Sequence, residues 1–322
     1  MLAFLQLMRD TMETIEIKDF VELPYGENVT QTASVSPVEN GLDYEILSET
    51  PSLEYLDYLN LSKVVEVLAE FFDVNSAAIS KEGLLCSVAL GSSCENVFEK
   101  IVESDPLCIS NSTIGFSKNV TLDVAKQITA MNFRNVISPS FDKAAVDFLT
   151  NDSNVNVIKI KSPLQELLGF NACDIKVTPF GYLVQSQNFS KLTKSSFKVA
   201  GKTKPTQQQA EDAIFAWKVA KYAKSKSAVI AKDLAVKAIV QSRHHSIESV
   251  ERAMDLACEN SKDAVLAVDG VVENEEIINT AIQGRIGLII ESGDLSNSSK
   301  FSKLADKYNI AYIVTGIRNN KY

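Results

Sequence analysis

The residues best equipped for chemistry in this sequence are cations gathered in one segment. Between Lys191 and Arg243 the chain carries 12 Lys or Arg against Glu211, Asp212 and Asp233. The segment therefore has a local balance of +9 inside a protein whose formal net charge is −9. Such cations can form solvated helix faces, or they can bind an anionic ligand, and the sequence leaves both interpretations open.

General catalytic and metal-binding motifs are missing from the sequence. There is no Walker loop, no G-x-G-x-x-G motif and no G-x-S-x-G elbow. The only two histidines, His244 and His245, are adjacent. They would point in different directions in a helix or a strand, so we expect them in a surface loop. The five cysteines lack C-x-x-C spacing, which predicts reduced, buried thiols rather than a zinc site or disulfides.

Composition limits the class of protein and its partners. The 322 residues are 45% apolar and 23% charged, which is typical of a globular protein of about two domains. The negative net charge argues against a general nucleic-acid binder. Residues 1–8 are apolar but lack a basic leader, and no apolar run approaches the ~18 residues of a membrane helix. We therefore expect a cytoplasmic protein with neither nucleic acid nor a membrane as partner.

From about residue 60, apolar runs alternate with amphipathic segments, which predicts a layered α/β fold. The first half has predicted helices near 63–72, 94–103, 121–132 and 142–149, with strands near 76–80, 85–90, 107–110, 134–138 and 155–160. The second half has helices near 206–224, 249–260, 273–283 and 298–309, with strands near 227–231, 235–240, 263–268, 285–290 and 310–315. The two halves share one order of elements, which indicates a duplication.

The duplication predicts four segments along the chain. They are an N-terminal segment (1–60), a first subdomain (61–160), a crossing segment rich in Pro and Gly (161–205) and a second subdomain (206–322). The best-defined helix follows Pro205, because Thr206 can cap it and Gln209 can close a capping box.

The same helix carries a specific motif. Residues 205–221 read P-T-x-x-x-x-x-D-x-x-F-A-W-K-V-x-K, followed by Lys224-Ser225. This run resembles the central helix of the aminoimidazole carboxamide ribonucleotide (AICAR) formyltransferases of purine synthesis. Weaker matches follow in the family's order, and the resemblance covers about residues 18–322. These matches include Tyr25-Gly26-Glu27-Asn28, Lys81 with Cys86, Ser242-Arg243, Asp269, and Thr315-Gly316 with Arg318.

The resemblance implies a fold, a reaction and an assembly. The fold is α/β, with two tandem cytidine-deaminase-like α/β/α subdomains. The reaction transfers a formyl group from formyl-tetrahydrofolate, as co-substrate, to the amine of the nucleotide AICAR, and it needs no metal. The family forms dimers with active sites built across the interface, so we expect a homodimer. It usually carries a cyclohydrolase domain in front, for which we expect no room in this chain.

The resemblance also implies which residues of this chain form the site, from their positions in the matched motifs. The resemblance assigns catalysis to Lys81, with Glu82 at the position of the family's histidine, and folate binding to Asp269. The expected substrate-binding residues are Tyr25, Gly26, Glu27, Asn28, Lys232 and Arg243.

Departures from the family motifs affect the same positions. The start motif R-Y-G-E-N-P-H-Q is here P-Y-G-E-N-V-T-Q, and K-H-x-N-P-C-G-V-A is here K-E-G-L-L-C-S-V-A. Losing a positioned general acid or base costs ~10²–10⁴ in rate. We expect Glu82 to pair with Lys81, which would hold the pKa of Glu82 low.

These departures predict formyl transfer that is reduced or lost. One alternative is a non-catalytic paralogue that binds a nucleotide or folate-like ligand, or that regulates an active family member. Another is a new acyl or amine chemistry in the same cleft.

Overall fold

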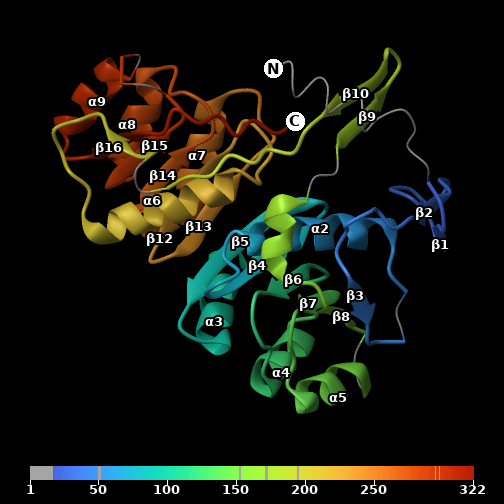
Figure 1. The fold of residues 1–322 in the computed structure, drawn as a ribbon. Helices are drawn as coiled ribbons and strands as arrows, with labels where there is room; N and C mark the ends of the chain where they lie inside the picture. The colour runs from blue at the N-terminus through green and yellow to red at the C-terminus, as the bar shows by residue number, and fades with distance from the viewer. Residues whose placement is uncertain are drawn as a thin grey trace.

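The computed structural model describes residues 17–49, 52–151, 154–170, 173–193, 196–293, 295–296 and 298–322. These residues form one 12-stranded sheet with helices on both faces (Figure 1). The strand order is β11-β16-β15-β14-β12-β13-β5-β4-β6-β7-β8-β3. The α/β class expected from the sequence is confirmed.

Two runs of elements follow the same order, as expected. The first run is α2 (Tyr55–Ala69), β4 (Asn75–Lys81), β5 (Leu84–Gly91), α3 (Cys94–Ser104), β6 (Thr113–Phe116), α4 (Leu122–Ala130), β7 (Asn135–Ser138), α5 (Lys143–Asn151) and β8 (Asn156–Ile160). The second run is α6 (Gln207–Ala220), β12 (Ala228–Lys232), β13 (Ala235–Val240), α7 (Ser246–Ala257), β14 (Val265–Val268), α8 (Glu275–Gln283), β15 (Leu288–Glu291), α9 (Ser299–Asp306) and β16 (Ala311–Val314).

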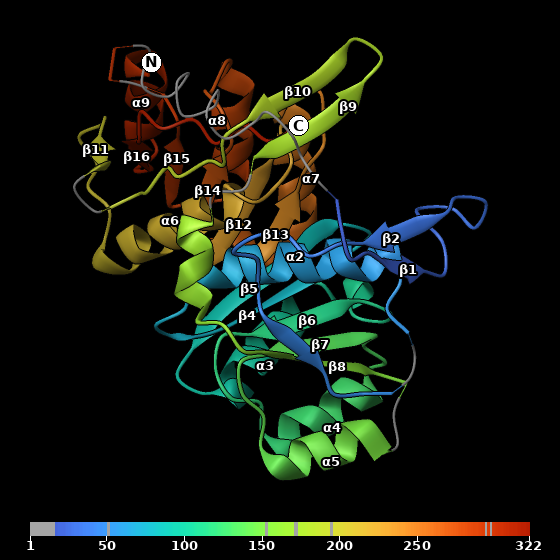
Figure 2. The same cartoon turned by 45° about the vertical axis from the view of Figure 1, so that its right-hand side comes forward.

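The remaining elements lie outside the two runs. They are β1 (Val21–Leu23), β2 (Ala33–Val35), β3 (Tyr44–Ile46), β9 (Asp174–Thr178), β10 (Gly181–Gln185), β11 (Lys198–Val199) and the 3-10 helices η1 (Pro106–Cys108), η2 (Leu164–Gly169) and η4 (Cys258–Ser261). Strands β9 and β10 form a hairpin that stands away from the main sheet (Figure 2).

The two runs share details of side-chain bonding as well as order. Asn60 Oδ1 accepts the Gly83 N–H at 2.8 Å at the β4–β5 turn, and Asp212 Oδ1 accepts the Leu234 N–H at 2.7 Å at the β12–β13 turn. Both hairpins also contain a register shift, between Ile79 and Ser80 in one and between Ile230 and Ala231 in the other. Equivalent residues therefore hold equivalent turns, which supports a duplicated unit.

The junction between the runs decides which strand ends lie together. β5 pairs antiparallel with β13 through Ala89 and Ala235. Antiparallel pairings lead from β14 through β12, β13, β5 and β4 to β6, so β6 runs opposite to β14. The carboxyl ends of β14–β16 therefore share one rim of the sheet with the amino ends of β6–β8. We call this the Asp269 rim, and the opposite one the Lys232 rim.

The core lies on both faces of the sheet. Helices α2 and α6 share one apolar cluster with the strands, while α3–α5 and α7–α9 pack in two clusters on the other face. Gly115 in β6 allows the close approach of α2, because a Cβ there would lie 2.1 Å from Val64 Cγ1. No helix in the described ranges is long and apolar enough to cross a bilayer.

Several local predictions are confirmed. The α6 capping box forms, since the Gln209 N–H donates to Thr206 Oγ1 at 3.1 Å and the Thr206 N–H to Gln209 Oε1 at 2.9 Å. His244 and His245 are exposed before α7, as expected. The five thiols are free, but Cys258 is exposed, so the prediction that all are buried was wrong.

Two predicted elements were misplaced. The strand expected near 107–110 lies later, at β6, because the Asp105 side chain accepts the Leu107 N–H and Pro106 starts the 3-10 turn η1. Helix α2 begins at Tyr55 rather than near residue 63, since Glu54 and Asp57 form a capping box there.

Candidate functional site

The Asp269 rim collects several of the residues expected to act together. Lys81 and Glu82 form the tip of the β4–β5 hairpin, Arg243 follows β13, and Asp269 follows β14. Lys232 lies at the tip of the β12–β13 hairpin, on the opposite rim, where its ammonium donates to the Lys262 carbonyl oxygen at 2.8 Å. The structure therefore separates Lys232 from Arg243.

A chain of hydrogen bonds connects the hairpin to Asp269. The Gln241 amide donates to the Leu85 carbonyl oxygen at 2.7 Å, and its Oε1 accepts the Lys224 N–H at 3.1 Å. The next residue, Ser225, donates its hydroxyl to Asp269 Oδ2. The first repeat thus reaches the site of the second repeat through directly bonded residues.

Lys81 and Glu82 do not form the expected ion pair. The Lys81 ammonium donates to the Ser110 carbonyl oxygen at 2.9 Å, and no ion pair between the two residues exists in the described structure. Glu82 is exposed in a left-handed conformation, with φ 53°, at the turn. The expectation was wrong because the turn directs the two side chains to different surroundings. No other side chain of the described residues forms a hydrogen bond or ion pair with Glu82 that would hold it for proton transfer.

Asp269 is a buried carboxylate with unused hydrogen-bonding capacity. Its Oδ1 has no partner among the described residues, and the buried hydroxyls of Ser227 and Ser292 lack one as well. Ser227 is adjacent, because its carbonyl oxygen accepts the Asp269 N–H at 2.9 Å. Burial raises the pKa of Asp269, whereas the Ser225 hydrogen bond and the Lys226 charge oppose the rise. Because the three residues are at most 5% exposed, a ligand reaches these polar atoms only if the strand ends open locally.

The Tyr25-Gly26-Glu27-Asn28 segment forms a closed loop after β1. The Gly26 N–H donates to the Gln31 carbonyl oxygen at 3.0 Å, and the Asn28 N–H donates to Gln31 Oε1 at 2.8 Å. A hydrogen bond to Glu54 raises the pKa of Tyr25. Glu27 and Asn28 are exposed. The loop therefore lies beside the start of α2.

Arg134 is a charged residue of this region that sequence reasoning missed. It precedes β7, so it lies on the Asp269 rim, and it binds Asp57 with Nε–Oδ1 2.8 Å and Nη2–Oδ2 3.0 Å. It also contacts Glu54 at 2.9 Å. Its place at the start of the strand predicted near 134–138 could have marked it. Because two carboxylates neutralise it, Arg134 does not replace the arginine missing before Tyr25.

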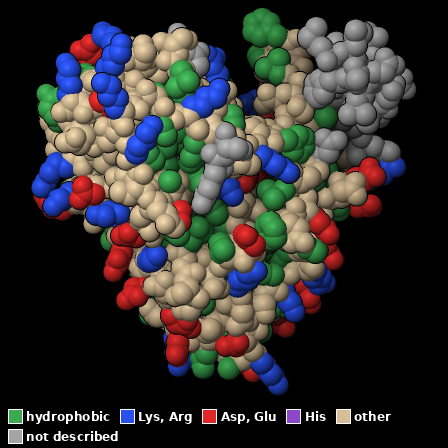
Figure 3. Space-filling model, turned by 60° about the vertical axis from the view of Figure 1, so that its left-hand side comes forward, with side chains coloured by type: hydrophobic (Ala, Val, Ile, Leu, Met, Phe, Trp, Pro, Cys, Tyr) green, Lys and Arg blue, Asp and Glu red, His purple; other side chains and the backbone are tan. Residues whose placement is uncertain are grey.

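Cations gather on one face of the molecule. Figure 3 shows one face on which Lys and Arg dominate the charged side chains of the upper half. Arg243 is exposed and has no ion-pair partner within the described ranges. Nowhere in those ranges do three His, Cys, Asp or Glu side chains lie close enough together to hold a metal ion.

Fold and rim together define a class of protein. It is a duplicated α/β protein whose repeats join edge to edge, with a polar site at the strand ends near the junction. The model of the AICARFT/IMPCHase bienzyme family matches residues 3–256, and the chain belongs to this family.

The chain is similar to bifunctional purine biosynthesis proteins PurH from several organisms. The chain is 29% identical to the protein of Thermoanaerobacter sp. strain X514 over 326 residues, which cover 98% of the chain and 63% of the relative. It is 31% identical to that of Fusobacterium nucleatum, over 96% of the chain and 60% of the relative. It is 28% identical to that of Dictyostelium discoideum, over 92% of the chain and 56% of the relative. The chain thus spans about 60% of the length of these relatives.

Proposed function

We propose that the chain binds an AICAR-like nucleotide and a folate at the Asp269 rim, and that its formyl transfer is reduced or lost. This proposal rests on which family residues lie together at the Asp269 rim and which one is replaced there. Lys81, Arg243 and Asp269 lie there, but Glu82 occupies the position of the proton-handling histidine and is exposed on a left-handed turn. Binding groups are thus retained where the acid-base group is not.

The proposed roles follow from the surroundings of each residue. Arg243 is the exposed cation for the substrate phosphate, and Asp269 has an acceptor free for the folate. Lys81 is the candidate for stabilising charge at the leaving nitrogen, but its ammonium must first leave the Ser110 carbonyl oxygen. Lys232 lies on the other rim, so it has no role in the proposed site of one chain.

A non-catalytic paralogue is the second candidate. It is favoured because two cations near the site are already bound within the chain. Lys81 donates to the Ser110 carbonyl oxygen, and two carboxylates bind Arg134. Such a protein would bind a nucleotide or folate-like ligand, or regulate an active member of the family, without turnover. Binding of only one of the two ligands, or a change in the turnover of an active family member when this chain is added, would support this candidate over the first.

Binding of AICAR is expected to be weak and sensitive to salt. Arg243→Gln should weaken it by about tenfold or more, because a charge-assisted hydrogen bond contributes roughly 1.5–3 kcal/mol. Calorimetric titration at low and at physiological salt measures both effects. Arg252→Gln, at an exposed arginine of α7 paired with Asp255, is the matched control. Micromolar or tighter wild-type binding in physiological salt would contradict the prediction.

A homodimer with an apolar interface is also proposed. The β9–β10 hairpin supports it, because Phe180 is fully exposed and Val177, Tyr182 and Leu183 are exposed around it. Light scattering should give twice the 35.3 kDa of the chain, and Phe180→Asp with Tyr182→Asp should shift the mass toward 35.3 kDa. Leu256→Asp, at an exposed leucine of α7, should leave it unchanged. A wild-type mass of one chain at micromolar concentration would refute the proposal.

A further inference from the structure

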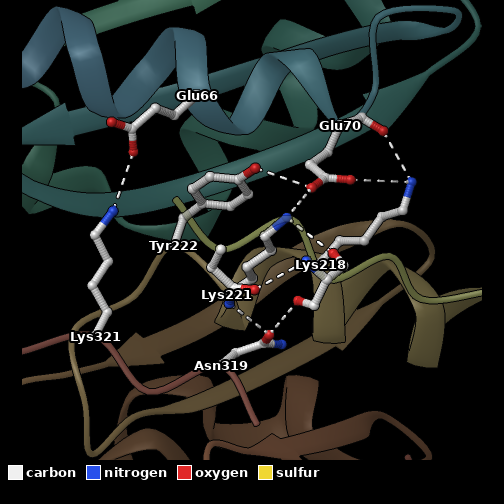
Figure 4. A network of polar contacts seen from close by, with 9 residues as sticks. Glu66, Glu70, Lys218, Lys221, Tyr222, Asn319 and Lys321 are labelled. Atoms are coloured by element: carbon white, nitrogen blue, oxygen red, sulfur yellow. Dashed lines mark hydrogen bonds and ion pairs between the residues drawn. The ribbon is translucent and has the colours of Figure 1, made fainter. Parts of the chain in front are cut away.

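Two lysines from distant parts of the chain share one carboxylate oxygen. Lys63 Nζ lies 3.7 Å from Glu66 Oε2, and Lys321 Nζ lies 3.3 Å from the same atom. Lys63 and Glu66 belong to α2 of the first repeat. Lys321 belongs to the C-terminal segment, and Figure 4 shows its ammonium directed at Glu66. One negative charge therefore faces two ammonium groups.

A third lysine adds to the positive charge. Lys224 precedes Ser225, whose N–H donates to the Lys321 carbonyl oxygen at 2.8 Å, and the Lys321 N–H donates back to Ser225 Oγ at 3.1 Å. These two hydrogen bonds hold Ser225 against Lys321, and the charges of Lys224 and Lys321 both act on Lys63. We call Lys63, Glu66, Lys224 and Lys321 the Lys63 cluster.

The cluster is short of negative charge. Burial lowers the pKa of Lys63 to about 8, and the charges of Lys321 and Lys224 add to this effect while Glu66 opposes it. Glu70, which caps the C-terminal end of α2, binds Lys221 at 2.8 Å, so it does not balance the cluster. Three ammonium groups and one carboxylate leave an excess of two positive charges.

The three lysines of the cluster differ in solvent exposure, with one nearly buried and two open to solvent. The Lys63 side chain is 14% exposed, whereas that of Lys321 is 38% exposed and Lys224 is exposed. A ligand can therefore reach the cluster from solvent and contact a partly desolvated ammonium at its base. Desolvated charges interact more strongly than charges in water.

We infer that the Lys63 cluster binds a small ligand carrying a phosphoryl dianion. Two negative charges balance the excess, and phosphoryl oxygens accept hydrogen bonds from several ammonium groups at once. The ligand can be free inorganic phosphate or the phosphate of a nucleoside monophosphate. The cluster adjoins the proposed site, because Ser225 bonds both Lys321 and Asp269. The inference does not rest on the proposed function, because it uses neither Lys81 nor Arg243 nor Asp269.

An ordinary salt bridge between α2 and the C-terminal segment is the competing explanation. The two explanations predict different effects of a Lys63 substitution on the stability of the protein as well as on ligand binding. If Lys63 only stabilised the fold, Lys63→Met would lower the melting temperature. If Lys63 is kept charged for a ligand, Lys63→Met should raise the melting temperature of the ligand-free protein, because it removes a repelled, buried ammonium.

The test combines calorimetric titration with thermal unfolding of the full chain. Inorganic phosphate, AMP and uncharged adenosine are titrated into the wild type, Lys63→Met and Lys321→Met. Lys126→Met, at an exposed lysine of α4 paired with Asp123, is the control. Lys321 is more exposed than Lys63, so its variant tests binding even if Lys63→Met folds poorly.

We expect the wild type and the control to bind phosphate alike, both cluster variants to bind it about tenfold or more weakly, and adenosine not to bind. AMP binding tighter than phosphate would identify a nucleotide as the ligand, and equal affinities would identify inorganic phosphate. The inference fails if the wild type binds neither phosphate nor AMP with a Kd of about 10 mM or tighter. It also fails if the cluster variants match the control, or if Lys63→Met lowers the melting temperature without changing affinity.

Discussion

Wild-type protein is expected to produce no formyl-AICAR above background from AICAR and formyl-tetrahydrofolate, and Glu82→His alone should not restore turnover. General acid-base catalysis supplies ~10²–10⁴ in rate, but only when the group is held within hydrogen-bonding reach. Position 82 is exposed at a hairpin tip, and the Lys81 ammonium beside it is bound to Ser110. Residues that act as one unit give coupled losses, so a single replacement recovers little.

Glu82→His is suited to this test because the variant protein should fold. Histidine tolerates the left-handed conformation of position 82 better than most residues do. Product can be followed by absorbance with a chromatographic check, and Lys81→Ala serves as the control. Measurable wild-type turnover that disappears in Lys81→Ala would overturn the prediction, and it would make Lys81 and Glu82 a working catalytic pair.

Glu70→Ala is expected to lower the free energy of unfolding by about 2–4 kcal/mol, because it leaves the partly buried cations Lys218 and Lys221 without their carboxylate partner. Glu70 ends α2 and joins it to α6. Its Oε1 accepts the Lys221 ammonium at 2.8 Å and the Tyr222 hydroxyl at 3.0 Å, and its Oε2 lies 3.8 Å from Lys218 Nζ (Figure 4). The side chains of Glu70 and Lys221 are each 12% exposed, so solvent screens this pair little.

Urea unfolding of Glu70→Ala beside Asp123→Ala measures the effect. Asp123 pairs with Lys126 on the surface of α4, where both side chains are more than half exposed, so its loss should cost at most about 0.5 kcal/mol. Similar losses in the two variants would show that the contact between α2 and α6 depends on apolar packing, such as that of Phe71 against Phe215, rather than on Glu70.

The order of elements could be predicted from the sequence because it depends on local patterns. Apolar periodicity reports a helix or a strand from its own side chains, and the Thr206 and Gln209 capping box depends on residues three apart. Both repeats were therefore visible as one order of helices and strands. The errors were local as well, since Pro106 and the Asp105 cap turned an apolar run into η1 instead of a strand.

The composition of the candidate site was decided by tertiary structure. Lys81 and Lys232 occupy equivalent turns in the sequence, yet the antiparallel pairing of Ala89 with Ala235 sends them to opposite rims. Only Lys81 therefore joins Arg243 and Asp269. Likewise, no local pattern could show that Lys63 and Lys321 meet at one oxygen of Glu66. Periodicity describes a chain over one or two turns, whereas the rim that a residue occupies depends on strand pairings between residues far apart in sequence.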